Sequence, residues 1–310
     1  MELPYLEPLH VMPADFPAEP ELPEGCREIS ISDDPVNVIL KTNIVYAEKD
    51  GMPLHLHVFM PTKGMMDRTK YPLIIYITGS AWMAQDMDSM IPDLCAFAKR
   101  GYCIASVQYR PSSVAPFPAQ VEDVKTAMRF MRMHADQYRA DVTKTAYFGA
   151  SSGGHTALFC GITGDDNPLP ELYPEYSCAA DAIVDWFGPT DFPVMNCRPS
   201  TQDHVQPTSP EGMVLGNVNV RDNMEKADAA NPRFRLSVEK ATPPVLIMHG
   251  DRDILVPFHQ SILLYERLRE LGKDVEFYKL LDASHGFNGF QSTAAYDLVD
   301  EFLRRKLQII

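Results

Sequence analysis

The sequence predicts an α/β fold in which a mainly parallel sheet carries helices on both faces. Three observations support this. Strand-like segments alternate with amphipathic helical segments, several strand-like segments are continuously apolar, and glycines close two of the helical segments. Residues 71–79, YPLIIYITG, show the apolar run expected of a strand buried on both faces. A chain of 310 residues can form one large domain of this class.

The elements follow in a regular order. Residues 1–36 are rich in proline and glutamate, which predicts an arm without long helices, and residues 37–310 form the main domain. The predicted strands are residues 36–46, 54–60, 71–79, 102–110, 144–151, 243–250 and 274–281, and residues 179–191 give a further strand and turn. The predicted helices are residues 89–101, 117–138, 153–162, 257–272 and 293–308. Residues 192–240, with many Pro, Asn and Asp, predict an irregular insertion or cap after the sixth strand.

Charge and hydropathy exclude several classes of partner. A net charge of −14 argues against binding to a nucleic-acid backbone. No run approaches the roughly 18 apolar residues of a membrane helix, so we expect no membrane partner. The first 26 residues lack the basic start and apolar stretch of a secretory signal, which predicts a cytoplasmic protein. The oligomeric state stays open, a homo-oligomer included.

One short motif indicates a nucleophilic serine. Gly149-Ala150-Ser151-Ser152-Gly153 fits G-x-S-x-G and lies between a predicted buried strand and a predicted helix. In that setting the serine occupies a tight, strained turn, and the glycines keep side chains out of it. The sequence therefore predicts Ser151 as a nucleophile at the C-terminal edge of the sheet.

A serine nucleophile needs a base and an orienting carboxylate. His285, after the last strand, is the candidate base; His249 is the rival, although it ends a strand and is better explained as structural. The carboxylate is Asp251 or Asp253, both of which follow the seventh strand. The order Ser, Asp, His along the chain is typical of this kind of site.

When a serine attacks a carbonyl group, the oxyanion that forms needs backbone N–H donors, and we expect these donors from two places. One is the amide of Ser152, directly after the nucleophile, and the other is the loop Thr78–Trp82 after the third strand. No cofactor is indicated. His55 and His57 share a strand face but have no evident third ligand, so we expect no metal.

The sequence resembles the α/β-hydrolase superfamily in its esterase/lipase branch, and within it bacterial carboxylesterases of the acetyl-xylan and feruloyl esterase-like group. The resemblance spans about residues 37–310. Its motifs are TGSAW, APFPAQVEDVKTAMRFMRMHA, GASSGG, HGDRDILVP and SHGF. It implies the α/β-hydrolase fold, with a mainly parallel eight-stranded sheet and a small irregular insertion after the sixth strand.

The resemblance also implies roles for particular residues. Asp253 rather than Asp251 would be the triad acid, and His285 the base. The usual oxyanion motif H-G-G-G-W is replaced by Thr-Gly-Ser-Ala-Trp; by position its donors would be Ser80 and Ala81.

The resulting hypothesis is a serine carboxylesterase acting on short-chain acyl esters, such as acetyl or feruloyl groups on carbohydrates. The substrate would be a small molecule or an oligosaccharide. Trp82 and Trp186 follow strand ends, so a flat indole face could stack on a sugar ring there; the alternative is that both are core residues. Two other functions remain as alternatives: an aminopeptidase or amidase of the same fold, and a binding protein without catalysis.

Overall fold

The structure is a computed structural model that describes residues 5–12, 15–29, 37–64, 67–286 and 289–309. The chain divides into two compact units, Met1–Asp34 and Pro35–Ile310. The described residues of the first unit contain no helix of more than a single turn and no strand. The second unit contains every element that positions the candidate site.

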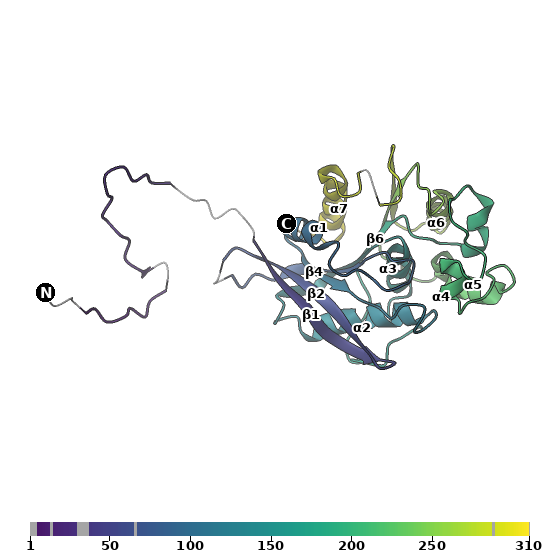
Figure 1. Ribbon diagram of the computed structural model, residues 1–310, viewed down its shortest axis with the longest axis horizontal. Helices are drawn as coiled ribbons and strands as arrows, with labels where there is room; N and C mark the ends of the chain where they lie inside the picture. The colour runs from purple at the N-terminus through teal and green to yellow at the C-terminus, as the bar shows by residue number, and fades with distance from the viewer. Residues whose placement is uncertain (1–4, 13–14, 30–36, 65–66, 287–288, 310) are drawn as a thin grey trace. The chain divides into compact units, whose positions relative to one another are not determined.

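The second unit is built on one eight-stranded sheet (Figure 1). Its strands are β1 Asn37–Lys49, β2 Met52–Thr62, β3 Tyr71–Ile77, β4 Cys103–Val107, β5 Ala140–Ala150, β6 Ala182–Trp186, β7 Val245–Gly250 and β8 Val275–Leu280. They lie in the order β1-β2-β4-β3-β5-β6-β7-β8. The first two pairings, β1 with β2 and β2 with β4, are antiparallel, and all later pairings are parallel.

Five helices cover the two faces of the sheet. They are α1 Ile91–Ala98, α2 Ala119–Met133, α3 Ser152–Thr163, α6 His259–Glu270 and α7 Thr293–Lys306. The apolar stripes of α1 and α7 pack on one face. Figure 1 shows these two helices as neighbours. The stripes of α2, α3 and α6 pack on the other face. Every residue of β3 is buried, because this central strand has helices on both sides.

The segment between β6 and β7 has its own small core. Its elements are η2 Phe192–Cys197, α4 Pro210–Val214, α5 Met224–Ala230 and η3 Pro232–Arg235. Apolar side chains from η2, α4 and α5 pack around Trp82, which comes from the loop after β3. We call residues 192–240 the cap.

The expected fold class is confirmed, with eight strands in the expected segments and helices on both faces. The insertion that we expected to be irregular contains short helices, which its many Pro, Asn and Asp residues did not indicate. Parallel strands end at one edge of a sheet, so the loops after β3, β5, β6, β7 and β8 gather there. Those loops carry all of the candidate catalytic residues.

Candidate active site

Ser151 stands at the sharp turn between β5 and α3. Its backbone has φ 57° and ψ −127°, a conformation that a residue with a side chain rarely adopts. Its amide donates a 2.8 Å hydrogen bond to the carbonyl of Trp186 at the end of β6, and its carbonyl accepts one of 3.0 Å from the His155 amide. Such strain persists only where the surroundings impose it, and here the neighbouring strand and helix do so.

The glycines of the motif are required by crowding around this turn. A Cβ at Gly149 would collide with the carbonyl of Gly153, and a Cβ at Gly153 would collide with the carbonyl of Ile77 in β3. Neither obstacle is a flexible side chain that could move aside. The two glycines therefore allow the turn to close against the neighbouring strand, as the motif predicts.

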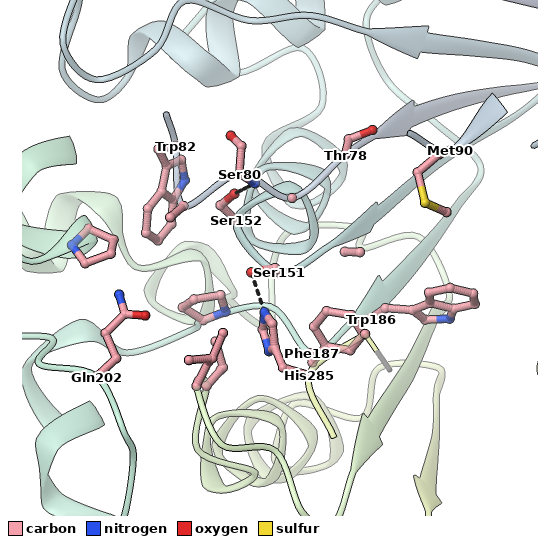
Figure 2. A pocket seen from close by; sticks show the side chains of 18 of the residues that line it. Thr78, Ser80, Trp82, Met90, Ser151, Ser152, Trp186, Phe187, Gln202 and His285 are labelled. Carbon is pink, nitrogen blue, oxygen red and sulfur yellow. Dashed lines mark hydrogen bonds between the residues drawn. The ribbon is translucent and has the colours of Figure 1, made fainter. Parts of the chain in front are cut away.

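Ser151, His285 and Asp253 are brought together by three different loops. Nε2 of His285 lies 2.9 Å from Oγ of Ser151, the contact drawn as a dashed line in Figure 2. Nδ1 of the same ring lies 2.8 Å from Oδ2 of Asp253. Since a carboxylate accepts, Nδ1 carries a hydrogen, and the neutral ring presents the Nε2 lone pair to the serine hydroxyl.

The side chain of Asp253 is fully buried and receives hydrogen bonds at both of its oxygens. Oδ1 accepts from the amides of Leu255 and Val256, at 2.8 and 2.9 Å. Oδ2 faces His285 and also Nε2 of His249, at 3.1 Å. Burial alone would raise the pKa of Asp253, but the hydrogen bonds from the two histidines outweigh it and hold the pKa well below its ordinary value. The carboxyl group is therefore ionised.

The other candidate residues have different surroundings. Asp251 is exposed, and its Oδ1 accepts a 2.8 Å hydrogen bond from the Asp282 amide. His249 is fully buried and joins Asp253 to Oγ of Ser261, at 2.7 Å from its Nδ1. The structure thus places Asp253, and not Asp251, against His285. It also gives His249 a contact with the same carboxylate that sequence reasoning missed.

The loop after β3 differs from expectation in one respect. The Ser80 amide donates a 2.9 Å hydrogen bond to Oγ of Ser152, as Figure 2 shows, so it is not directed at a reacting carbonyl. The Ala81 amide is bonded to none of the residues that the structure describes. Ser152 is the first residue of α3, where an amide has no partner within the helix. Ala81 and Ser152 both line the cavity that contains Ser151. Their backbone amides are therefore the free donors, whereas the Ser80 amide is already bonded.

A hydroxyl network that sequence reasoning missed supports this loop. Oγ of Ser80 lies 2.9 Å from the hydroxyl of Tyr109, which lies 3.3 Å from Oγ of Ser152. Oγ of Ser80 also donates to the carbonyl of Met83 at 2.7 Å. The network holds Ala81 and Trp82 at φ 54° and 55°, where glycine would be usual. The serine at position 80, where the family usually has glycine, is the signal that could have indicated it.

The expectation that Trp82 and Trp186 offer stacking faces is not met. Each side chain is only 1% exposed, although both touch the wall of the cavity. The indole N–H of Trp82 points at Nδ1 of His155, 3.3 Å away, and that of Trp186 points at the sulfur of Met248. Both rings pack in hydrophobic cores, the alternative that the sequence left open.

The cavity around Ser151 has a volume of about 490 Å³. One part of its lining is apolar and includes Tyr76, Met90 and Phe187. The cap contributes another part, which is polar and includes His204 and Glu211. The polar cap residues were not among the residues expected from the sequence, because nothing in their local pattern indicates a site.

Two further results concern metals and membranes. Across the described ranges of the chain, no three histidine, cysteine, aspartate or glutamate side chains come close enough together to hold a metal ion. In the same part of the chain, none of the helices combines the length and the apolar character that crossing a bilayer requires.

The fold and the elbow define the chain as an α/β-hydrolase of the esterase branch. Residues 56–268 match the BD-FAE family model, and the chain belongs to that family. Among curated proteins, Esterase LipC of Mycobacterium tuberculosis is 28% identical over 84% of this chain and 60% of its own length. LipM of the same organism, a probable carboxylic ester hydrolase, is 27% identical over 72% of this chain and 51% of its own length. The chain thus spans between half and two thirds of these relatives.

Solved structures are similar over most of the chain. A truncated carbohydrate esterase from gut microbiota is 28% identical, with a TM-score of 0.78 over 89% of this chain and 99% of that one. A bifunctional GH43-CE protein of Bacteroides eggerthii is 30% identical, with a TM-score of 0.74 over 90% of this chain and 39% of that one.

Proposed function

We propose that the protein is a serine carboxylesterase that hydrolyses short-chain acyl esters, with Ser151 as nucleophile, His285 as general base and Asp253 as the orienting acid. The observation that carries the proposal is the continuous path Ser151 Oγ to His285 Nε2, 2.9 Å, and His285 Nδ1 to Asp253 Oδ2, 2.8 Å. A hydroxyl becomes a useful nucleophile only beside such a base.

The reaction follows from this geometry. Nε2 of His285 takes the Ser151 proton as Oγ attacks the ester carbonyl, and the buried Asp253 carboxylate stabilises the imidazolium. The amides of Ala81 and Ser152 donate to the oxyanion of the tetrahedral intermediate. The imidazolium then protonates the leaving alcohol, which leaves an acyl-enzyme. His285 next activates a water molecule that releases the acid and regenerates Ser151.

We further propose that the alcohol part is a carbohydrate and the acyl group is acetyl, with feruloyl as the second choice. The names of the two structural relatives, which are carbohydrate esterases or include one, support this choice. No metal or cofactor enters the proposal, so we expect excess EDTA to leave the rate unchanged.

A panel of substrates on the purified protein tests the proposal. We expect hydrolysis of p-nitrophenyl acetate and acetylated xylo-oligosaccharides, and poor hydrolysis of esters with acyl chains of ten or more carbons. Faster cleavage of aminoacyl anilides than of acetyl esters would replace this proposal with the aminopeptidase or amidase alternative. Inertness towards the whole panel would favour a binding protein.

A further inference from the structure

The cap places a buried pair of ionisable side chains in the wall of the cavity that holds Ser151. His204 and Glu211 are 1% and 2% exposed, and both line this cavity. Nδ1 of His204 lies 3.0 Å from Oε2 of Glu211. A buried charged pair costs desolvation free energy, so a carboxylate on the cavity wall calls for an explanation in terms of binding.

Two polar atoms of this pair, one on each side chain, lack well-aligned hydrogen-bond partners among the described residues. Nε2 of His204 lies 2.9 Å from the carbonyl of Leu255, so Nε2 carries a hydrogen. The other nitrogen, Nδ1, and Oε2 of Glu211 face each other at ion-pair distance. However, neither atom makes an aligned hydrogen bond to any residue in the described part of the chain. A buried imidazolium and carboxylate normally make aligned hydrogen bonds at these atoms, and both side chains line the cavity in which the hydroxyls of a substrate would lie.

Hydrogen bonds fix the pair relative to the candidate triad. Oγ of Ser200 donates 2.7 Å to the carbonyl of Leu255, which also accepts from His204. The amide and hydroxyl of Thr201 both donate to the carbonyl of Ile254, at 2.8 Å. Ile254 and Leu255 directly follow Asp253 in the chain. This wall of the cap is therefore held against the loop that carries the candidate acid.

The cavity consequently has two chemically different sides. Figure 2 shows Ser151 between Gln202 of the cap on one side and Met90 on the other. The cap side offers an amide, an imidazole and a carboxylate, whereas the other side offers apolar side chains. An acetyl group needs few polar contacts, while an alcohol part with many hydroxyls needs several.

We propose that Glu211 and His204, together with Gln202, form a hydroxyl-binding subsite that holds the alcohol part of the ester, which is a sugar or another polyol. The proposal rests on the ester hydrolase function proposed above. Glu211 accepts a hydrogen bond from one substrate hydroxyl, and the His204 ring and the Gln202 amide complete the binding of its neighbours.

The test compares two acetyl esters that differ in the alcohol: an acetylated xylo-oligosaccharide and p-nitrophenyl acetate, whose leaving group has no additional hydroxyl. The readout is the ratio of their kcat/KM values, in which a change common to both substrates cancels. We expect Glu211→Gln and Gln202→Leu each to lower this ratio about tenfold, the usual effect of losing one hydrogen bond to a charged or buried partner. Glu225→Gln, the same change on an exposed cap position, serves as the matched control and should keep the ratio within about twofold.

A second readout does not depend on turnover. Calorimetry of xylobiose binding to the Ser151→Ala protein should show binding that weakens about tenfold when Glu211→Gln is added. Unchanged ratios and unchanged xylobiose binding in properly folded variants would overturn the subsite while leaving the esterase proposal intact. If Ser151→Ala has no effect on ester hydrolysis, the proposed function fails, and xylobiose binding still decides whether the subsite exists.

Discussion

The amide of Ser80 donates a hydrogen bond of 2.9 Å to Oγ of Ser152, so the loop after β3 is tied directly to the residue that follows the candidate nucleophile. The Tyr109 hydroxyl contacts Oγ of both serines. The amides of Ala81 and Ser152 are therefore held in one rigid group. Preorganised donors of this kind stabilise an oxyanion without a reorganisation cost at the moment of reaction.

The Tyr109→Phe variant tests that support. Without its hydroxyl the loop loses a buried contact, and we expect kcat for p-nitrophenyl acetate to fall about tenfold with little change in KM, because the loss affects mainly the transition state. Tyr102→Phe is the matched control. It removes another buried tyrosine hydroxyl, which donates 2.6 Å to Oδ1 of Asp300 in α7. Equal kcat values for the two variants would remove Tyr109 from the positioning of the loop.

Ser151 and His285 are expected to be indispensable. Ser151→Ala and His285→Ala should each lower kcat by roughly 10⁴ or more, while thermal unfolding changes little, because both side chains lie at the cavity. A fluorophosphonate probe should label the unaltered protein and not the Ser151→Ala variant. Labelling that survives this substitution, or near-normal turnover in either variant, would place the nucleophile elsewhere.

The two aspartates after β7 should differ sharply. Asp253→Asn places an amide against Nδ1 of His285, which favours the wrong tautomer of the ring, so we expect kcat to fall by about 10³ to 10⁴. Asp251→Asn alters an exposed side chain and should change kcat by less than about threefold. The steady-state kinetics of both variants provide the check. The opposite ranking would transfer the role of the acid to Asp251.

Buried His155 should make stability depend on pH. Burial lowers the pKa of His155 from 6.5 to about 4, although the carbonyl of Ala230 opposes the shift. Between these values the unfolded chain binds a proton that the folded protein does not, so stability falls as pH decreases from about 6.5 to 4. At about 1.36 kcal/mol per pH unit, the loss is at most about 3.4 kcal/mol.

Denaturant unfolding of the unaltered protein and the His155→Gln variant at several pH values measures this contribution. The variant should have a flatter dependence of unfolding free energy between pH 4 and 6.5, whatever its stability at pH 7. The comparison cancels the other titrating groups, among them His204, whose pKa shifts in the opposite direction. Parallel curves for the two proteins would mean that folding does not lower the pKa of His155.

The sequence was most informative where a local pattern reflects a local constraint. The run at 71–79 predicts β3 because a strand covered on both faces must be apolar throughout, and G-x-S-x-G predicts the elbow because Gly149 and Gly153 meet backbone atoms. The roles of Ser80 and Tyr109 depend on partners distant in the chain. The serine in place of the usual glycine marks position 80 but does not identify those partners. Trp82 shows the same limit, since its position after a strand end does not reveal the cap residues that cover it.

The attachment of the cap to Ile254 and Leu255 has a mechanical consequence. These residues adjoin Asp253, whose Oδ1 is bonded to the Leu255 amide, so an outward movement of the cap at Ser200 and Thr201 would pull on the carboxylate that orients His285. We expect a bulky alcohol that forces the cap open to be turned over slowly even when it binds well. Opening of the cavity to the substrate would then be coupled to the position of the Asp253 carboxylate against His285. A mutation that widens the entrance would therefore reduce the rate constant of the chemical step.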